Sequence, residues 1–303
     1  MITAERLDGR TLGCIGIALL TWSSAYASIA YALAAFTPGE IALARLGIAS
    51  ACFAVLLAVR RVALPARRDW PQLACLGVIG LTVYQLCLNL AETRVASGTA
   101  SILISLVPAA TAAVSALWLR ERLSGRMLAG LGVALFGVVL VIVTSGREVT
   151  FQPMALMVLV SVMASAVFFV GLKPMFARNS MLGVTAFTFF AGTLGALPFG
   201  WQLPQALAAA PWPRVMALLW LGIAPTFIGY LAWNVALRRT SASQVSSFIY
   251  FSPPIAVLIG MLWLHEEPGL LTLLGGVITI LGVVVANTRR RVPVAIAPVS
   301  GQP

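Results

Sequence analysis

Long apolar blocks, separated by short polar stretches, run through the whole chain. Ten blocks can be drawn, at residues 11–33, 40–59, 71–91, 97–118, 126–144, 153–173, 181–201, 213–236, 243–264 and 269–287. A helix that spans a bilayer needs roughly 20 mostly apolar residues. The pattern therefore predicts an all-α polytopic membrane protein with ten transmembrane helices. Arg6 and Arg10 before the first block resemble the start of a signal peptide, but the block is too long for one and further spans follow.

Two parts of this pattern match each other at an offset of 145 residues. The matched pairs include Gly77 with Gly222, Asn89 with Asn234, Pro108 with Pro253, Trp118 with Trp263 and Glu121 with Glu266. Chance similarity between apolar segments would preserve Leu and Val, not Asn, Pro, Trp and Glu. Each half holds five spans, an odd number, so the second half enters the membrane inverted, as in many secondary transporters. We expect a first repeat at 1–148, a second repeat at 149–288 and a Pro-rich, disordered cytoplasmic tail at 289–303.

The composition agrees with a membrane protein. Of the 303 residues, 60% are hydrophobic and only 10% are charged, whereas soluble domains carry about 25% charged residues. The net charge of +11 could suggest nucleic-acid binding, but 16 of the 20 basic residues fall on the side of the N-terminus. This bias is the positive-inside signal of a multi-pass protein of the bacterial inner membrane with both termini in the cytoplasm. We therefore expect a lipid bilayer, and no nucleic acid, as the macromolecular environment.

Ionisable and sulfur-containing residues are placed unfavourably for catalysis. All nine carboxylates fall in loops or at helix ends, and the single histidine lies in "HEEPG" rather than in a zinc-binding HExxH. The four cysteines lie within spans and show no CxxC spacing. The sequence predicts no enzyme, no metal site and no cofactor. It also predicts a transport path without an intramembrane carboxylate, which suits a neutral or zwitterionic metabolite and transport without carboxylate coupling in the membrane.

Polar and aromatic residues near the middle of the spans are the candidates for substrate binding. Ser101 and Ser105 share a helix stripe with Pro108, and Tyr250 shares the matching stripe with Pro253. A stripe of small residues can equally be a packing seam. The remaining candidates are Trp22, Ser23, Tyr84, Gln85, Phe168 and Tyr230. Arg45, slightly inside the second span, could extend its charge outward or offer it to a substrate carboxylate.

Prolines interrupt two of the spans. Pro108 and the pair Pro253–Pro254 lie at mid-span, where a proline frees carbonyls of the preceding turn. Such backbone is tolerated in a membrane where it lines a wet cavity. We expect these prolines to kink their helices around the site and to act as hinges; the alternative is a static kink. We expect Glu121 and Glu266 to pair with basic groups at helix ends, and the Gly-rich fifth and tenth spans to pack closely or to form a homodimer seam.

The inverted repeat, the paired "P(x)8LWLxE" segments and the Gly-rich last span resemble the EamA-type carriers of the drug/metabolite transporter superfamily, and among them aromatic amino-acid exporters of the YddG type. The resemblance implies a central cavity between two four-helix sets and export of amino acids or related metabolites by alternating access. A multidrug carrier or a carrier of another metabolite, with the same fold, is the alternative within transport. A membrane scaffold or sensor that transports nothing is the alternative from another class.

Overall fold

The computed structural model describes residues 8–119, 125–144, 153–239 and 248–287. Over these ranges the chain is helical and contains no strand, which confirms the all-α prediction. Six helical segments there are long and apolar enough to cross a bilayer, and four shorter apolar helices accompany them, at Ser97–Thr111, Gly132–Val141, Ser252–Leu264 and Leu270–Gly282. The count of ten spans stays a prediction.

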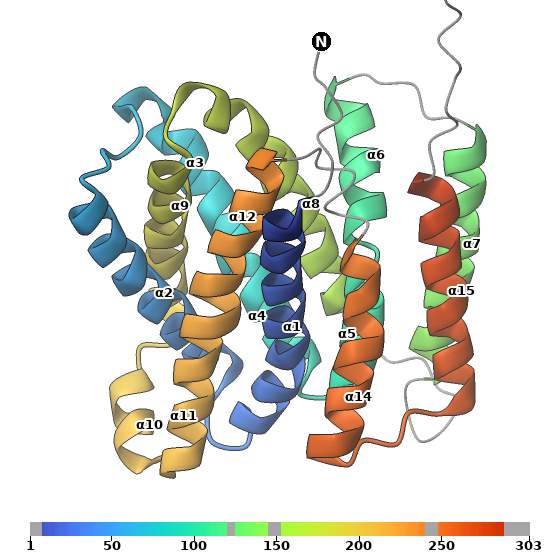
Figure 1. The fold of residues 1–303 in the computed structure, drawn as a ribbon. Helices are drawn as coiled ribbons and strands as arrows, with labels where there is room; N and C mark the ends of the chain where they lie inside the picture. The colour runs from blue at the N-terminus through green and yellow to red at the C-terminus, as the bar shows by residue number, and fades with distance from the viewer. Residues whose placement is uncertain (1–7, 120–124, 145–152, 240–247, 288–303) are drawn as a thin grey trace, which may run out of the picture.

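The helices of the first half run back and forth through the molecule, and some passes consist of two consecutive helices (Figure 1). They are α1 (Gly9–Ala32), α2 (Pro38–Arg60), α3 (Trp70–Gly77), α4 (Tyr84–Ala91), α5 (Ser97–Ile104), α6 (Val107–Leu119) and α7 (Gly125–Thr144). Side-chain caps begin the first two. Asp8 accepts a hydrogen bond from the Thr11 amide, and Thr37 and Glu40 form a reciprocal capping box.

The second half repeats this order upside down. Its helices are α8 (Ala155–Arg178), α9 (Met181–Ala196), α10 (Leu203–Ala209), α11 (Trp212–Leu221), α12 (Gly229–Arg239), α14 (Ser252–Leu264) and α15 (Leu270–Asn287). The segment from α3 to α4 runs away from the end where α1 begins, and its repeat mate from α11 to α12 runs toward that end (Figure 1). The described halves therefore have opposite directions, as the odd number of spans predicts.

The prolines predicted to break two spans lie at true interruptions. The helix that α5 and α6 form is discontinuous at Ser105–Leu106, and Pro108 is the second residue of α6. In the second half, the short 3-10 segment Phe248–Phe251 precedes α14, in which Pro253 is the second residue. At the first turn of a helix a proline loses no intrahelical hydrogen bond. The break itself, rather than strain within a continuous helix, accommodates these prolines.

A second pair of interruptions was not predicted. Val78–Val83 between α3 and α4, and Gly222–Ile228 between α11 and α12, form π-helical segments. The offset of 145 residues carries Val78–Val83 onto 223–228, so the same irregularity occurs in both repeats. Widened turns of this kind are frequent at functional sites.

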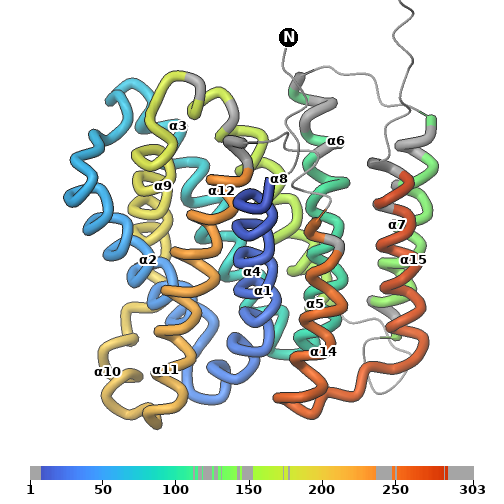
Figure 2. Tube along the Cα trace, viewed as in Figure 1, coloured from blue at the N-terminus to red at the C-terminus, as the bar shows by residue number. Residues whose placement is uncertain are grey.

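Helices α7 and α15 pack along each other at one side of the molecule, away from α1 and α2 (Figure 2). Glycines make this approach possible. A Cβ on Gly137 would lie 2.5 Å from the Thr279 amide, and a Cβ on Gly282 would lie 2.3 Å from the Ala134 amide. Close packing within one chain therefore accounts for these two glycines, and the homodimer stays a prediction.

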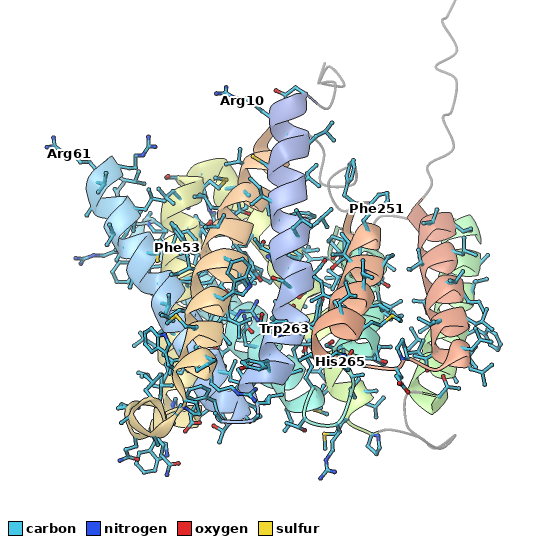
Figure 3. The ribbon with its side chains drawn as sticks, turned by 60° about the horizontal axis from the view of Figure 1, so that its bottom comes forward. Arg10, Phe53, Arg61, Phe251, Trp263 and His265 are labelled. Carbon is cyan, nitrogen blue, oxygen red and sulfur yellow. The ribbon has the colours of Figure 1, made fainter. Side chains whose placement is uncertain are left out.

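The described charges follow the predicted asymmetry. Arg10 and Arg61 point away from the helices at the end where α1 begins, whereas Trp263 and His265 lie toward the opposite end (Figure 3). Arg60, Arg67, Arg68 and Arg178 also belong to segments at the first end. For brevity we call the end that carries Arg10 and Arg61 the basic end, and the end that carries His265 the far end.

Candidate functional site

A cavity lies among helices of both repeats, near the middle of the molecule. It holds about 650 Å³ of space between protein atoms, part of it open to solvent. Its walls are mainly aromatic and aliphatic, and they carry a single guanidinium. The lining residues are Trp22, Ala25, Tyr26, Arg45, Tyr84, Leu88, Ile104, Val107, Ser165, Phe169, Tyr230, Ile249 and Ser252.

Arg45 is the charged group of the cavity wall. Its side chain is only 4% exposed, so it does not extend outward from the helix as one of the two expectations held. Nε donates to Thr226 Oγ1 at 2.6 Å and Nη1 donates to Gln85 Oε1 at 2.9 Å. No described residue accepts a hydrogen bond from Nη2, and no described carboxylate forms an ion pair with Arg45. A buried charge is costly unless it is paired, so this site favours an anionic ligand group.

The partners of Arg45 lie in or just after the π-helical segments: Thr226 belongs to Gly222–Ile228, and Gln85 is the second residue of α4, directly after Val78–Val83. Pro225 has no amide hydrogen, so it cannot donate to the carbonyl of Leu221, four residues earlier. The Thr226 hydroxyl donates to that carbonyl at 2.6 Å and is thereby oriented as the acceptor for Arg45 Nε. The carbonyl of Pro225 accepts from Trp22 Nε1 at 2.9 Å, which fixes the indole at the cavity wall.

The helix breaks also face the cavity. Val107 and Ser252, the first residues of α6 and α14, both line it. The N-terminus of a helix carries a partial positive charge and free amide groups. Two such termini, together with Arg45, make the interior of the cavity electropositive. Ser252 is held by Ser23, whose hydroxyl lies 3.0 Å from the Ser252 hydroxyl.

Aromatic rings form the remaining wall. The Trp22 ring packs edge-on against Tyr230 with centroids 5.5 Å apart, and against Trp233 at 4.8 Å. Tyr230 in turn contacts Phe189 at 5.3 Å. Such a surface suits an apolar or aromatic side chain, because ring edges and faces attract one another beyond simple burial.

The structure places the predicted residues in three groups. Trp22, Tyr84 and Tyr230 line the cavity. Gln85 and Ser23 lie behind its wall. Gln85 forms a hydrogen bond with Arg45, and Ser23 forms one with Ser252. The last group is Phe168, Ser101 and Ser105, which lie outside the lining; Phe168 packs against Gly80, whose added Cβ would meet it at 2.3 Å. Ser101 and Ser105 donate to carbonyls of their own helix, those of Gly98 and Ile102.

For the other predictions the structure gives a mixed account. The side chain of Tyr250 and all of Glu121 lie outside the described residues. Pro108 and Pro253 lie one residue from Val107 and Ser252 of the lining. Tyr26, Ser165 and Phe169, which are polar or aromatic residues near mid-span like the other candidates, also line the cavity. Helical periodicity over α8 does not distinguish Phe169 from Phe168, because both faces of α8 are apolar.

Contacts between the repeats lie at the far end of the molecule. Glu266, after α14, accepts hydrogen bonds from the Ser97 amide and hydroxyl, both at 2.9 Å, and from the Gly98 amide at 3.2 Å. Its partners are thus the N-terminus of α5 and not the basic groups expected from the sequence. Nearby, the Arg214 guanidinium lies over the Tyr31 ring, and Tyr31 stacks on Trp263.

Comparisons with known proteins agree with this architecture. The chain matches the model of the EamA-like transporter family twice, at residues 11–143 and 152–288. A protein of Streptantibioticus cattleyicolor named a probable terminal-alkyne amino-acid exporter is 33% identical, over 90% of this chain and 92% of its own length. The uncharacterized transporter YdfC of Bacillus subtilis is 30% identical, over 86% of each chain.

More distant relatives extend the comparison. The pseudopaline exporter CntI of Pseudomonas aeruginosa is 26% identical, over 91% of this chain and 95% of its own. One solved crystal structure superposes with a TM-score of 0.63 at 22% identity, covering 91% of this chain and 96% of that one, which shows a shared fold. One family match lies in each half of the chain.

Proposed function

Because the chain belongs to the EamA-like transporter family, we propose that it exports amino acids, or related small metabolites that carry a carboxylate, by alternating access. Export takes place across the bacterial inner membrane, with ten spans and both termini in the cytoplasm. The strong excess of basic residues on the side of the N-terminus supports this orientation. The relative named as an amino-acid exporter supports the substrate class.

The observation that carries the proposal is the buried guanidinium of Arg45. It lines the cavity, two polar side chains orient it, and no described carboxylate neutralises it. A planar guanidinium is well matched to a carboxylate, with which it can form two parallel hydrogen bonds. The two half-helix N-termini at Val107 and Ser252 favour the same negative group. The aromatic wall around Trp22 then accepts the apolar part of the substrate.

The alternatives meet specific objections. A carrier of bulky drug cations needs an acidic counter-charge in its path, and the cavity lining contains Arg45 and no carboxylate. A scaffold or sensor without flux needs no cavity, whereas an electropositive one lies at the junction of the two repeats. The same lining supports exchange that needs no carboxylate within the membrane.

The repeat indicates which helices move during alternating access. We propose that α3–α6 and their repeat mates rock against the other helices, with Pro108, Pro253 and Pro254 at the bending points. The Gly-rich flank of α7 and α15 is the proposed homodimer seam.

Counterflow in proteoliposomes tests the proposal. Liposomes are loaded with an unlabelled amino acid, and labelled tryptophan, threonine or methionine is offered outside with no ion gradient. We expect labelled substrate to accumulate only when the internal solute retains a free carboxylate, and not when it is the carboxamide. Arg45→Gln should weaken apparent affinity by about 10- to 100-fold, since hydrogen bonds to charged groups contribute about 1.5–3 kcal/mol.

The matched control is Arg10→Gln, which removes an exposed charge at the basic end and should leave counterflow unchanged. Equal transport of an amino acid and its carboxamide by the unmodified protein would contradict the role of Arg45. Silence for all amino acids, with or without a pH gradient, would contradict the substrate class itself.

A further inference from the structure

Three oxygen atoms at the C-terminal end of α4 are buried without a hydrogen-bond donor. They are both carboxylate oxygens of Glu92 and Oδ1 of Asn89. Glu92 is 6% exposed and Asn89 is fully buried. The amide nitrogen of Asn89 is used, since it donates to the carbonyl of Pro38 at 3.0 Å. Buried acceptors without donors are rare in folded proteins, because each loses its hydrogen bonds to water on burial.

One proton would satisfy two of these atoms. Asn89 and Glu92 are three residues apart, so their side chains are neighbours on one face of the helix end. A protonated Glu92 becomes a donor, and Asn89 Oδ1 is the unused acceptor beside it. An ionised Glu92 would instead place a buried negative charge against further acceptors, which is far more costly.

The charges around Glu92 agree with a protonated form. The facing ionisable groups are Glu266 from the connection after α14, Arg45 from α2, Tyr26 from α1 and Tyr84 from α4. Glu92 lies just beyond the apolar span that ends at Ala91. Burial raises the pKa of its carboxyl well above the ordinary value, the Glu266 carboxylate raises it further, and Arg45 lowers it.

Glu266 connects this site to closure of the far end. The same carboxylate that faces Glu92 accepts the amide and hydroxyl hydrogen bonds of Ser97 and the amide of Gly98, and so fixes the start of α5 to the second repeat. This step rests on the proposed function. In alternating access, these contacts must separate when the far end opens. Water then reaches the segment between α4 and α5, where Glu92 lies.

We propose that Glu92 and Asn89 form a proton-binding site whose occupancy accompanies closure of the far end. Closing the end removes Glu92 from water and binds one proton; opening it releases that proton to the same side. The site therefore regulates opening without moving a proton across the membrane. A carboxyl group with a raised pKa in the closed form makes closure most favourable below its ordinary pKa. Closure then weakens by about tenfold per pH unit until the raised pKa is reached.

A cysteine reporter measures this linkage without any substrate. Val95 is buried beside the start of α5, so Val95→Cys, in a chain whose native cysteines are replaced by serine, reports opening through its rate of modification in nanodiscs. Each rate is divided by the rate in the same chain with Glu92→Gln, which cancels the pH dependence of the thiol. Gln keeps the size of a protonated Glu and cannot titrate.

We expect this ratio to rise about tenfold per pH unit above the ordinary range of glutamate. Glu267→Gln, which removes an exposed carboxylate in the same connection, should leave that slope intact. A flat ratio overturns the proton site while leaving the counterflow result untouched. A ratio that depends on sodium and not on pH also overturns it, in favour of a cation site.

An infrared spectrum of the unmodified protein tests the same proposal and does not depend on whether a variant folds. The spectrum should contain the carbonyl band of a protonated carboxyl group, and this band should disappear only at a pH above the ordinary range of glutamate. Absence of the band at neutral pH would show Glu92 to be ionised and would overturn the proposal.

Discussion

At the scale of single residues, the position of a residue along its span predicts the aromatic residues of the site but does not predict the placement of Arg45. Trp22, Tyr84 and Tyr230 were chosen as aromatic residues near mid-span, and all three line the cavity. For Arg45 the sequence allows two placements, with the charge extended outward or offered to a substrate. Its hydrogen-bond partners Gln85 and Thr226 are 40 and 181 residues away. The periodicity of one helix cannot show such partners, so the decision between the two placements needed the tertiary structure.

The indole of Trp22 gives a prediction at this scale. Trp22→Phe keeps a ring at the wall but loses the hydrogen bond from Nε1 to the Pro225 carbonyl. A hydrogen bond of this kind contributes about 1 kcal/mol, so we expect roughly a fivefold loss of apparent affinity in counterflow. Trp22→Ala also loses the contacts with Tyr230 and Trp233 and should lose more.

The control is Trp212→Ala, which removes an indole that is 68% exposed and lies outside the cavity lining. It should leave both affinity and folded yield unchanged. If the Trp22 and Trp212 variants transported equally well, Trp22 would not belong to the binding wall.

At the scale of elements, the broken helices were predictable and the π-helical segments were not. Pro108 and Pro253 mark their breaks directly, because a proline inside a helix costs a hydrogen bond and clashes with the preceding turn, whereas the first turn of a helix accepts it. In the first repeat the π-helical segment contains Gly80 in place of a proline. Close contact of Gly80 with Phe168, not a local sequence signal, accompanies the widened turn there.

Pro225 permits a test of what the second π-helical segment does. Pro225→Ala restores an amide that can donate to the Leu221 carbonyl, and it thereby competes with the Thr226 hydroxyl that orients Arg45. We expect higher thermal stability, since an interior proline costs about 3 kcal/mol, together with a weaker apparent affinity for carboxylate substrates. The measurement is a melting curve and a counterflow titration on the same preparation.

Pro174→Ala is the matched control, because Pro174 is also inside a helix but is exposed on α8 and away from the cavity. The Pro174→Ala variant should have higher thermal stability than the unmodified protein and the same apparent affinity for substrate. If Pro225→Ala were stabilised and bound substrate as tightly as the unmodified protein, the π-helical segment would serve packing alone.

At the scale of the whole molecule, the repeat made the architecture accessible from one sequence. An offset that aligns Asn, Pro, Trp and Glu, together with an odd number of spans per half, predicts two antiparallel halves, and the described helices follow that order. The repeat cannot predict a feature that occurs in one half only. The position 145 residues after Glu92 is Leu237, so the buried acid belongs to one half only and has no symmetric signal in the sequence.

The peripheral pair α7 and α15 provides the last prediction, on stability. Gly137→Ala would place a Cβ 2.5 Å from the amide and hydroxyl of Thr279. Backbone cannot yield as a flexible side chain does, so we expect a loss of about 1–3 kcal/mol from overpacking. Gly132→Ala, one and a half turns earlier on α7, would meet nothing within 4 Å. It should be neutral or should gain up to about 1 kcal/mol from helix propensity. Melting curves in one detergent compare the two variants directly. Equal stability would mean that α7 and α15 do not pack through Gly137, and the glycines of these helices would then be free to form the homodimer seam.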